Sequence, residues 1–259
     1  MKAILRLLLG FTILATLTLR ADAADIRVFA AASLTEAFKA IGTAYERVDP
    51  FDHVDYSFGG SPTLRTQIQQ GAQVDIFASA DRPNMDVLTA AHLAGSPVIF
   101  ARNTLVVIAP SSSTTVNRIS DLAGNGVRVV LAGPKVPAGR YAEEILAKMT
   151  PGIASNFNKS VMANVVSREI DVKAVVAKVQ LGEADAGIVF ATDAIAAGSK
   201  VRTIPIPAKY NVTAEYPIAV LSSSTIPVIA SKFIAFINSP AGQSILRAHG
   251  FLSGQAAQP

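Results

Sequence analysis

The chain has 259 residues, of which half are apolar and 16% are charged, a composition that provides an ample buried core and excludes a disordered chain. Its formal net charge is only +4 and it contains neither a basic run nor a tryptophan, so we expect no nucleic-acid partner. No cysteine is present, which excludes disulfides, thiolate metal sites, cysteine nucleophiles and a lipid-modified cysteine anchor.

The N-terminal segment 1–23 predicts a secretory signal peptide. Lys2 and Arg6 precede an apolar run over residues 7–19, and Ala21 and Ala23 are small residues at the positions that a signal peptidase reads. The run is shorter than the ~20 apolar residues of a membrane span, and no later segment reaches that length. We therefore expect cleavage after Ala23, no membrane insertion of the mature chain and a periplasmic location, with free secretion as the alternative.

After the signal peptide, short apolar runs typical of strands alternate with segments of helical periodicity. The predicted strands are 26–31, 54–58, 76–80, 105–109, 127–132, 161–166, 187–190, 201–206 and 219–221. The predicted helices are 34–45, 62–70, 84–91, 141–149, 172–179, a helix around 229–237 and a last helix before Gly250.

This alternation predicts an α/β protein whose sheets are mainly parallel and carry helices on both faces. The roughly 236 residues after the signal peptide exceed the ~150 typical of one domain. Because no flexible linker is evident, we expect two lobes between which the chain crosses more than once. The expected lobe I comprises 24–102 plus 213–259, and lobe II comprises 103–212; one continuous sheet is the alternative.

Two strand-to-helix junctions of the expected lobe I carry a serine. Ligands of open α/β sheets bind beyond the carboxyl ends of strands, and a helix start suits an anion because of its unpaired N–H groups and positive dipole end. Ser33 has the capping-box spacing with Glu36, while Ser61 follows two glycines and precedes Pro62 as the predicted N-cap. An ordinary structural cap is the alternative at both positions.

Two junctions of the expected lobe II offer only backbone amides. The segment 133–140 is rich in glycine and proline but lacks the spacing of a phosphate-binding loop, and we expect its Lys135 and Arg140 to be solvated surface charges. At the other junction, Asp171 is the predicted N-cap, which leaves the Val172 amide at the open helix end. Together the four junctions predict a cleft between lobes that holds a small anion from both sides.

Motifs along nearly all of the mature chain resemble one known family. They are VFAAASL at 28–34, SPTLRTQI at 61–68, DIFASAD at 75–81, VPAGRYA at 136–142, GEADAGIVF at 182–190 and EYPIAV at 215–220. On these segments the chain resembles the periplasmic molybdate-binding proteins of ABC importers. The resemblance implies a two-lobed periplasmic binding protein fold, capture of molybdate or tungstate in the cleft, and docking of the closed form on an ABC transporter permease. We expect the protein to act as a monomer.

Members of that family hold the oxyanion with hydroxyl and amide donors of two serines and with amides of the second lobe. The resemblance therefore implies Ser33, Ser61, Ala138 and Val172 as the ligand-binding residues. Members often add a tyrosine hydroxyl from a GIVY segment, where this chain has Phe190, so one donor is absent. Molybdenum would enter only as the bound oxyanion, so we expect no direct metal ligands and no cofactor.

Other functions fit the residues less well. We expect no enzyme, because the three histidines are far apart, the G-x-S-x-G motif is absent and no base is indicated beside either serine. Sulfate is the alternative ligand, since it shares charge and shape with molybdate. Phosphate would require a proton acceptor, which Asp171 could supply, and ferric iron would require a cluster of tyrosine, histidine or carboxylate ligands. A sensory module with the same fold is a further alternative.

Overall fold

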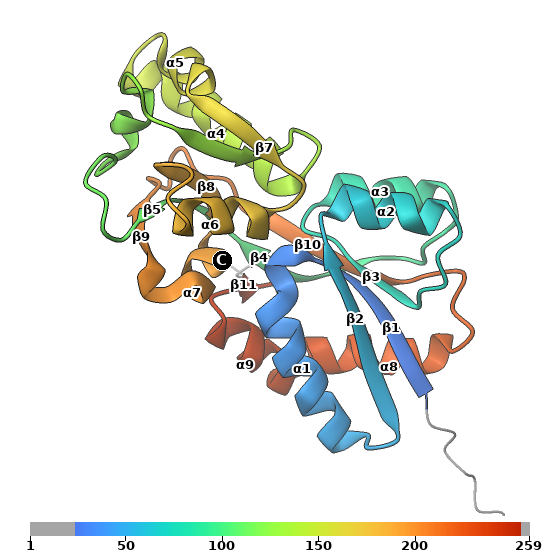
Figure 1. Cartoon of the computed structure of the whole chain (residues 1–259). Helices are drawn as coiled ribbons and strands as arrows, with labels where there is room; N and C mark the ends of the chain where they lie inside the picture. Colours follow the sequence, from blue (N-terminus) through green and yellow to red (C-terminus); the bar gives the residue numbers. More distant parts are fainter. Residues whose placement is uncertain (1–23, 255–259) are drawn as a thin grey trace, which may run out of the picture.

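The computed structural model describes residues 24–254, so the predicted signal peptide lies outside the described residues. This part of the chain forms two sheets, each flanked by helices (Figure 1). Along 24–254, no helix has both the length and the apolar character needed to cross a membrane.

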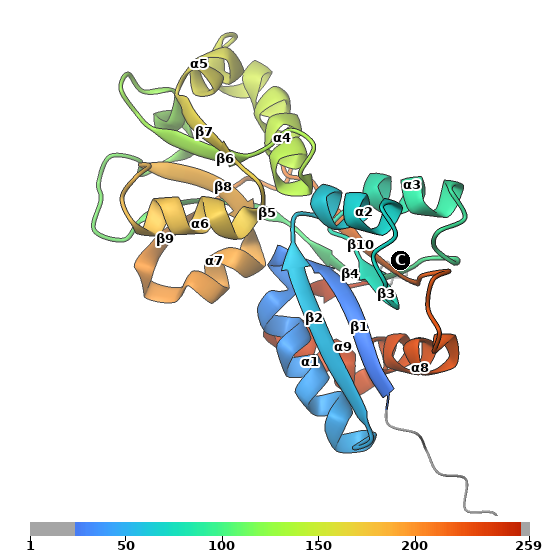
Figure 2. The same cartoon turned by 45° about the vertical axis from the view of Figure 1, so that its right-hand side comes forward.

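The first sheet has six strands in the order β11-β4-β10-β3-β1-β2. Its strands are β1 (Ala24–Ala31), β2 (Asp52–Gly59), β3 (Ile76–Ala78), β4 (Val98–Asn103), β10 (Ala214–Val220) and β11 (Leu252–Ser253). One face carries α2 (Ser61–Gln69) and α3 (Arg82–Ala90). The other face carries α1 (Thr35–Val48), α8 (Pro227–Asn238) and α9 (Pro240–Ala248) (Figures 1 and 2).

Strand alternation explains why this sheet is covered on both faces. Phe77 packs with Leu64 and Leu88 in a cluster under α2 and α3, whereas its neighbours Ile76 and Ala78 belong to the larger core on the opposite face. All three strand residues are fully buried, as expected when successive side chains point to opposite, helix-covered faces.

The second sheet has five strands in the order β7-β6-β8-β5-β9. Its strands are β5 (Leu105–Pro110), β6 (Val129–Ala132), β7 (Val165–Glu169), β8 (Ala186–Phe190) and β9 (Val201–Pro205). Figure 2 shows α4 (Pro137–Ile153) and α5 (Phe157–Ala163) on one side of this sheet, with α6 (Val172–Gln180) and α7 (Ala191–Ala197) on the other. Short 3-10 helices occupy Ala32–Leu34, Ile119–Ala123 and Gly198–Lys200.

Along the described residues, the chain passes between the sheets twice, from β4 to β5 and from β9 to β10. Asn211 ties the two passages together, because its Oδ1 accepts a hydrogen bond from the Leu105 amide (3.2 Å) and its Nδ2 donates to the Leu105 carbonyl (2.9 Å). On this basis we keep as a proposal the division into lobe I, 24–102 plus 213–259, and lobe II, 103–212.

The α/β class with two helix-flanked sheets is confirmed, but the sheets are mixed rather than mainly parallel. In the first sheet only the β1–β2 and β1–β3 pairings are parallel, and in the second only β6–β7 and β6–β8 are. The remaining pairings are antiparallel. The physical reason lies in the crossings: β10 returns from the other sheet without a crossover helix and inserts antiparallel between β3 and β4.

The predicted strand at 161–166 is wrong in its first half. Val161 is buried on α5, one helical turn after the buried Phe157, and the strand begins only at Val165. A short apolar run fits either element, and the i, i+4 partner decides in favour of the helix. The strand β4 and the helix α7 were not among the predicted elements.

Candidate functional site

Three parallel strands of each sheet end next to the other sheet. In the first sheet these strands are β1, β2 and β3, and in the second they are β6, β7 and β8. The segments that follow them line one small pocket. The four residues predicted to bind the ligand belong to its lining, namely Ser33, Ser61, Ala138 and Val172, and so does Phe190, the position where a donor is absent.

Ser33 follows β1 and is buried at 3% exposure. It lies inside the 3-10 helix Ala32–Leu34 that precedes α1, and its hydroxyl oxygen is 3.0 Å from the hydroxyl of Tyr216. The predicted capping box with Glu36 is wrong, because the Ser33 side chain caps no amide and Glu36 instead pairs with Lys173. Freed from capping, the Ser33 hydroxyl is available at the pocket wall.

Ser61 is the first residue of α2 rather than its N-cap. Gly60 takes the cap position, since its carbonyl accepts from the amides of Thr63 and Leu64. The Ser61 hydroxyl, 1% exposed, accepts a hydrogen bond from the Ala80 amide at 3.1 Å, and Ala80 also lines the pocket. Because this bond uses the oxygen of Ser61 as acceptor, the hydroxyl proton remains free to donate.

The second lobe contributes helix starts without side-chain donors at the contact positions. Ala138 is the second residue of α4 and Val172 the first residue of α6. The first amides of a helix have no acceptor within the helix and point along its positive dipole end. Asp171 is the N-cap of α6, as predicted, with its Oδ1 accepting from the Ala174 amide at 3.0 Å.

Phe190 closes the pocket at the end of β8 without offering a donor. Its ring is 1% exposed and packs near Tyr216 and Tyr141, with centroid distances of 5.6 and 6.4 Å. Neither the Tyr141 nor the Thr192 side chain belongs to the pocket lining, and Thr192 Oγ1 already accepts from Asn103. The Phe190 side chain itself therefore contributes no hydrogen-bond donor to the pocket.

Ion pairs between the lobes flank the pocket on two sides. Arg140 was predicted as a solvated charge, but its Nη2 lies 3.1 Å from Oδ2 of the buried Asp81, which is also the N-cap of α3. On the other side Lys173 Nζ lies 2.7 Å from Glu36 Oε2 and 3.4 Å from Asp193 Oδ1. Arg140 lies two residues after Ala138, and Lys173 directly follows Val172. Each ion pair to lobe I is therefore adjacent in the chain to a residue that lines the pocket.

The backbone of Gly60 forms a direct contact between the lobes. A Cβ added at Gly60 would overlap the carbonyl oxygen of Ile170, which immediately precedes Asp171 in lobe II. Only glycine can occupy this position while the lobes stand as close as they do here.

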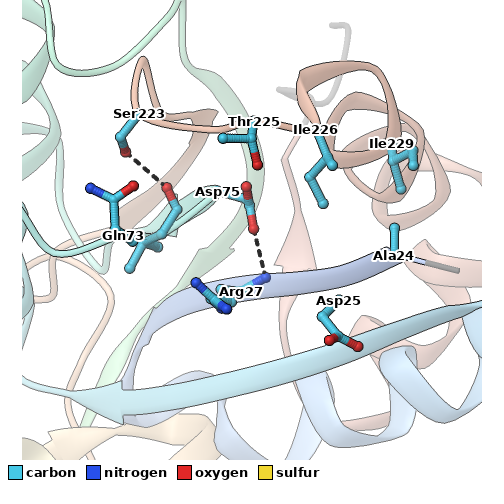
Figure 3. A pocket seen from close by; sticks show the side chains of 10 residues that line it. Ala24, Asp25, Arg27, Gln73, Asp75, Ser223, Thr225, Ile226 and Ile229 are labelled. Atoms are coloured by element: carbon cyan, nitrogen blue, oxygen red, sulfur yellow. Dashed lines mark hydrogen bonds between the residues drawn. The ribbon is translucent and has the colours of Figure 1, made fainter. Parts of the chain in front are cut away.

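A larger cavity lies at the opposite end of the first sheet (Figure 3). It has about 710 Å³ of empty volume at the amino ends of β1 and β3, and Asp25, Arg27 and Asp75 line it. Asp75 is already occupied, since its carboxylate accepts from the Arg27 amide (2.9 Å) and pairs with Ser224 Oγ (2.6 Å). Two carboxylates against one guanidinium make this cavity a poor anion site.

Comparisons with known proteins agree with the geometry. The family model described as bacterial extracellular solute-binding protein matches residues 26–252. The chain is 39% identical over 231 residues to the molybdate-binding protein ModA of Mycobacterium tuberculosis, covering 88% of this chain and 85% of that protein. It is 32% identical over 241 residues to the molybdate-binding protein ModA of Haemophilus influenzae, covering 89% and 91%.

The fold is also that of a solved structure. The periplasmic molybdate-binding protein of Azotobacter vinelandii superposes with a TM-score of 0.78, covering 89% of this chain and all of that one. At 23% identity this match speaks for the fold alone.

Proposed function

Because the chain belongs to the family of bacterial extracellular solute-binding proteins, we propose that it captures molybdate, or the similar tungstate, between its lobes and delivers it to the permease of an ABC importer. In this proposal the signal peptide 1–23 directs the protein to the periplasm, where the mature chain acts as a monomer. The 39% and 32% identical relatives named for molybdate binding support the choice of ligand.

One observation carries the proposal: four helix starts, two from each lobe, meet at a single small pocket. Ser33 and Ser61 supply hydroxyls as well as amides, and Ala138 and Val172 supply amides. A tetrahedral dianion needs donors on all sides, and fixed N–H and O–H groups satisfy it without a neutralising basic side chain in the pocket. No lysine or arginine belongs to the lining of this pocket.

The same geometry favours binding over catalysis. Among residues 24–254, neither serine hydroxyl has a histidine or carboxylate partner that could act as a general base, since Ser33 pairs with Tyr216 and Ser61 with the Ala80 amide. His53 is 62% exposed and pairs with Glu46 at the surface. We propose that the anion is released chemically unchanged and that the protein uses no cofactor.

Isothermal titration with molybdate, tungstate, sulfate and hydrogen phosphate tests the proposal. We expect molybdate and tungstate to bind, and Ser61→Ala to weaken molybdate binding at least about tenfold through the loss of a charge-assisted donor. The matched control is Ser231→Ala on α8, an exposed serine that bonds only the Pro227 carbonyl, which should bind as wild type. Equal affinity for sulfate would make the protein a general oxyanion carrier, and no binding of any anion would refute the site.

A further inference from the structure

Tyr216 is a buried phenol behind Ser33 that the amino-acid pattern did not single out as a site residue. It lies on β10, 183 residues away from Ser33 in the chain, and is 0% exposed. The rings of Phe100, Phe190 and Phe251 pack around it with centroid distances of 6.3, 5.6 and 5.4 Å. Its ring is therefore fixed, and only its hydroxyl makes polar contacts, with Ser33 Oγ at 3.0 Å and Asn103 Nδ2 at 3.4 Å.

The direction of the protons follows from the amide of Asn103. Its Oδ1 accepts from the Thr104 amide at 2.9 Å, which places Nδ2 toward Thr192 Oγ1 (2.9 Å) and the Tyr216 hydroxyl (3.4 Å). An amide nitrogen can only donate, so the Tyr216 oxygen accepts from Asn103. Burial raises the pKa of Tyr216 well above its ordinary value, so the phenol keeps its proton. The partner left for that proton is Ser33 Oγ.

We propose that Tyr216 is a positioning residue of the oxyanion site: it donates to Ser33 Oγ and thereby turns the Ser33 proton toward the pocket. Ser61 reaches the same state by accepting from the Ala80 amide. This inference rests on the proposed function, because it names how that same pocket selects its anion. Both serines then present protons, which suits a fully deprotonated dianion.

A protonated anion such as hydrogen phosphate meets a mismatch at Ser33. If Ser33 accepts a proton from the anion by turning its own proton toward Tyr216, that proton meets an oxygen that already accepts from Asn103. The Tyr216 proton would then be buried without an acceptor, since the described residues place no further polar atom within hydrogen-bond distance of it. Such an orphaned donor is unfavourable, so the relay from Asn103 through Tyr216 to Ser33 discriminates against protonated anions.

The variant Tyr216→Phe removes the hydroxyl and keeps the ring. We expect its molybdate dissociation constant, measured by calorimetry at pH 8, to rise about tenfold, and its preference for molybdate over hydrogen phosphate to fall by a similar factor. The matched control is Tyr45→Phe, which removes another buried phenol, bonded to Asp52 at 2.8 Å and remote from the pocket. That control should lower the melting temperature and leave both dissociation constants unchanged.

A double-mutant cycle with Ser33→Ala separates positioning from packing. If Tyr216 acts through Ser33, adding Tyr216→Phe to Ser33→Ala changes the dissociation constant less than about twofold. A tenfold loss in both backgrounds would overturn the inference, as would Tyr216→Phe that binds like wild type while Ser33→Ala binds weakly. If Ser33→Ala itself binds like wild type, the proposed site is wrong and the role of Tyr216 is lost with it.

Discussion

Lys173 and Glu36 join the two lobes, with Nζ and Oε2 2.7 Å apart. Lys173 directly follows Val172, and Glu36 lies three residues after Ser33. The pair thus connects the helix start of one lobe to that of the other. Arg140 and Asp81 make the equivalent connection on the opposite side, at 3.1 Å. Both ion pairs therefore join the lobes through charged side chains that do not line the pocket.

Breaking the second of these pairs should weaken binding. We expect Arg140→Gln to raise the molybdate dissociation constant about tenfold, because the closed form loses an ion pair to a carboxylate that is 1% exposed. Asp81 keeps its bonds from Asn84, so the variant should still fold. Titration calorimetry at low and high salt measures the effect. As control, Arg118→Gln breaks the pair with Asp121 inside lobe II, at an 81% exposed side chain, and should not change binding.

Restoring a hydroxyl at Phe190 should strengthen binding. We expect Phe190→Tyr to lower the molybdate dissociation constant about tenfold, because the pocket corner gains a donor to the anion. Calorimetry checks this, with the melting temperature of the ligand-free variant as a check on folding. An unchanged dissociation constant would mean that a water already supplies the donor at this corner.

The buried Asp193 should make stability depend on pH. Burial raises its pKa to about 7, against the opposing charge of Lys173 and with support from Glu36 and Asp171. Its side chain is 0% exposed, and Lys173 Nζ lies 3.4 Å from its Oδ1. Between its ordinary pKa of 3.8 and about pH 7, the folded state holds a proton that the unfolded state has lost, so stability falls as pH rises through this window.

Replacing that carboxyl isolates its contribution. We expect Asp193→Asn to be more stable than wild type by on the order of 1–3 kcal/mol at pH 8, and close to wild type at pH 4. Urea unfolding at several pH values measures the difference. A difference that stays constant from pH 4 to pH 8 would contradict the assignment of this titration to Asp193.

Asn211 should matter for stability at the passages between the sheets. We expect Asn211→Ala to cost about 2 kcal/mol, because it leaves the amide and the carbonyl of Leu105 without their side-chain partners. Urea unfolding with and without molybdate measures the change. Asn238→Ala is the control, since that exposed side chain bonds only the Ile234 carbonyl of its own helix. A loss no larger than that of the control would show that water replaces Asn211.

The sequence predicted where the strand-to-helix junctions lie, but it did not predict their capping geometry. Short apolar strands followed by small residues and serine located Ser33 and Ser61 at helix starts, because parallel strands end where helices begin. The capping roles were wrong, since the 3-10 turn places the N-cap of α1 one residue later, at Leu34, and the N-cap of α2 lies one residue earlier, at Gly60. Capping depends on backbone angles that residue types only bias.

The missing parts depend on contacts between distant segments. Tyr216 was visible only as a member of EYPIAV, and nothing in its neighbours indicates that β10 inserts beside β3, where it faces Ser33. The partner of Arg140, Asp81, also lies outside its local sequence, 59 residues away in the chain. The hydrophobic periodicity of neighbouring residues predicts single helices and strands. The contacts of Tyr216 with Ser33 and of Arg140 with Asp81 depend instead on how the chain passes between the two sheets.

The backbone contact between Gly60 and Ile170 limits how closely the two lobes can approach each other. Where two backbones touch, the spacing of the lobes is fixed by bond lengths and atomic radii, not by side chains that can repack. In our proposal this contact fixes the distance between the donors of the two lobes. An anion that is too large prevents the contact between Gly60 and Ile170, and one that is too small cannot reach the donors of both lobes at once. Selection by anion size would thus depend on the absence of a Cβ atom at residue 60.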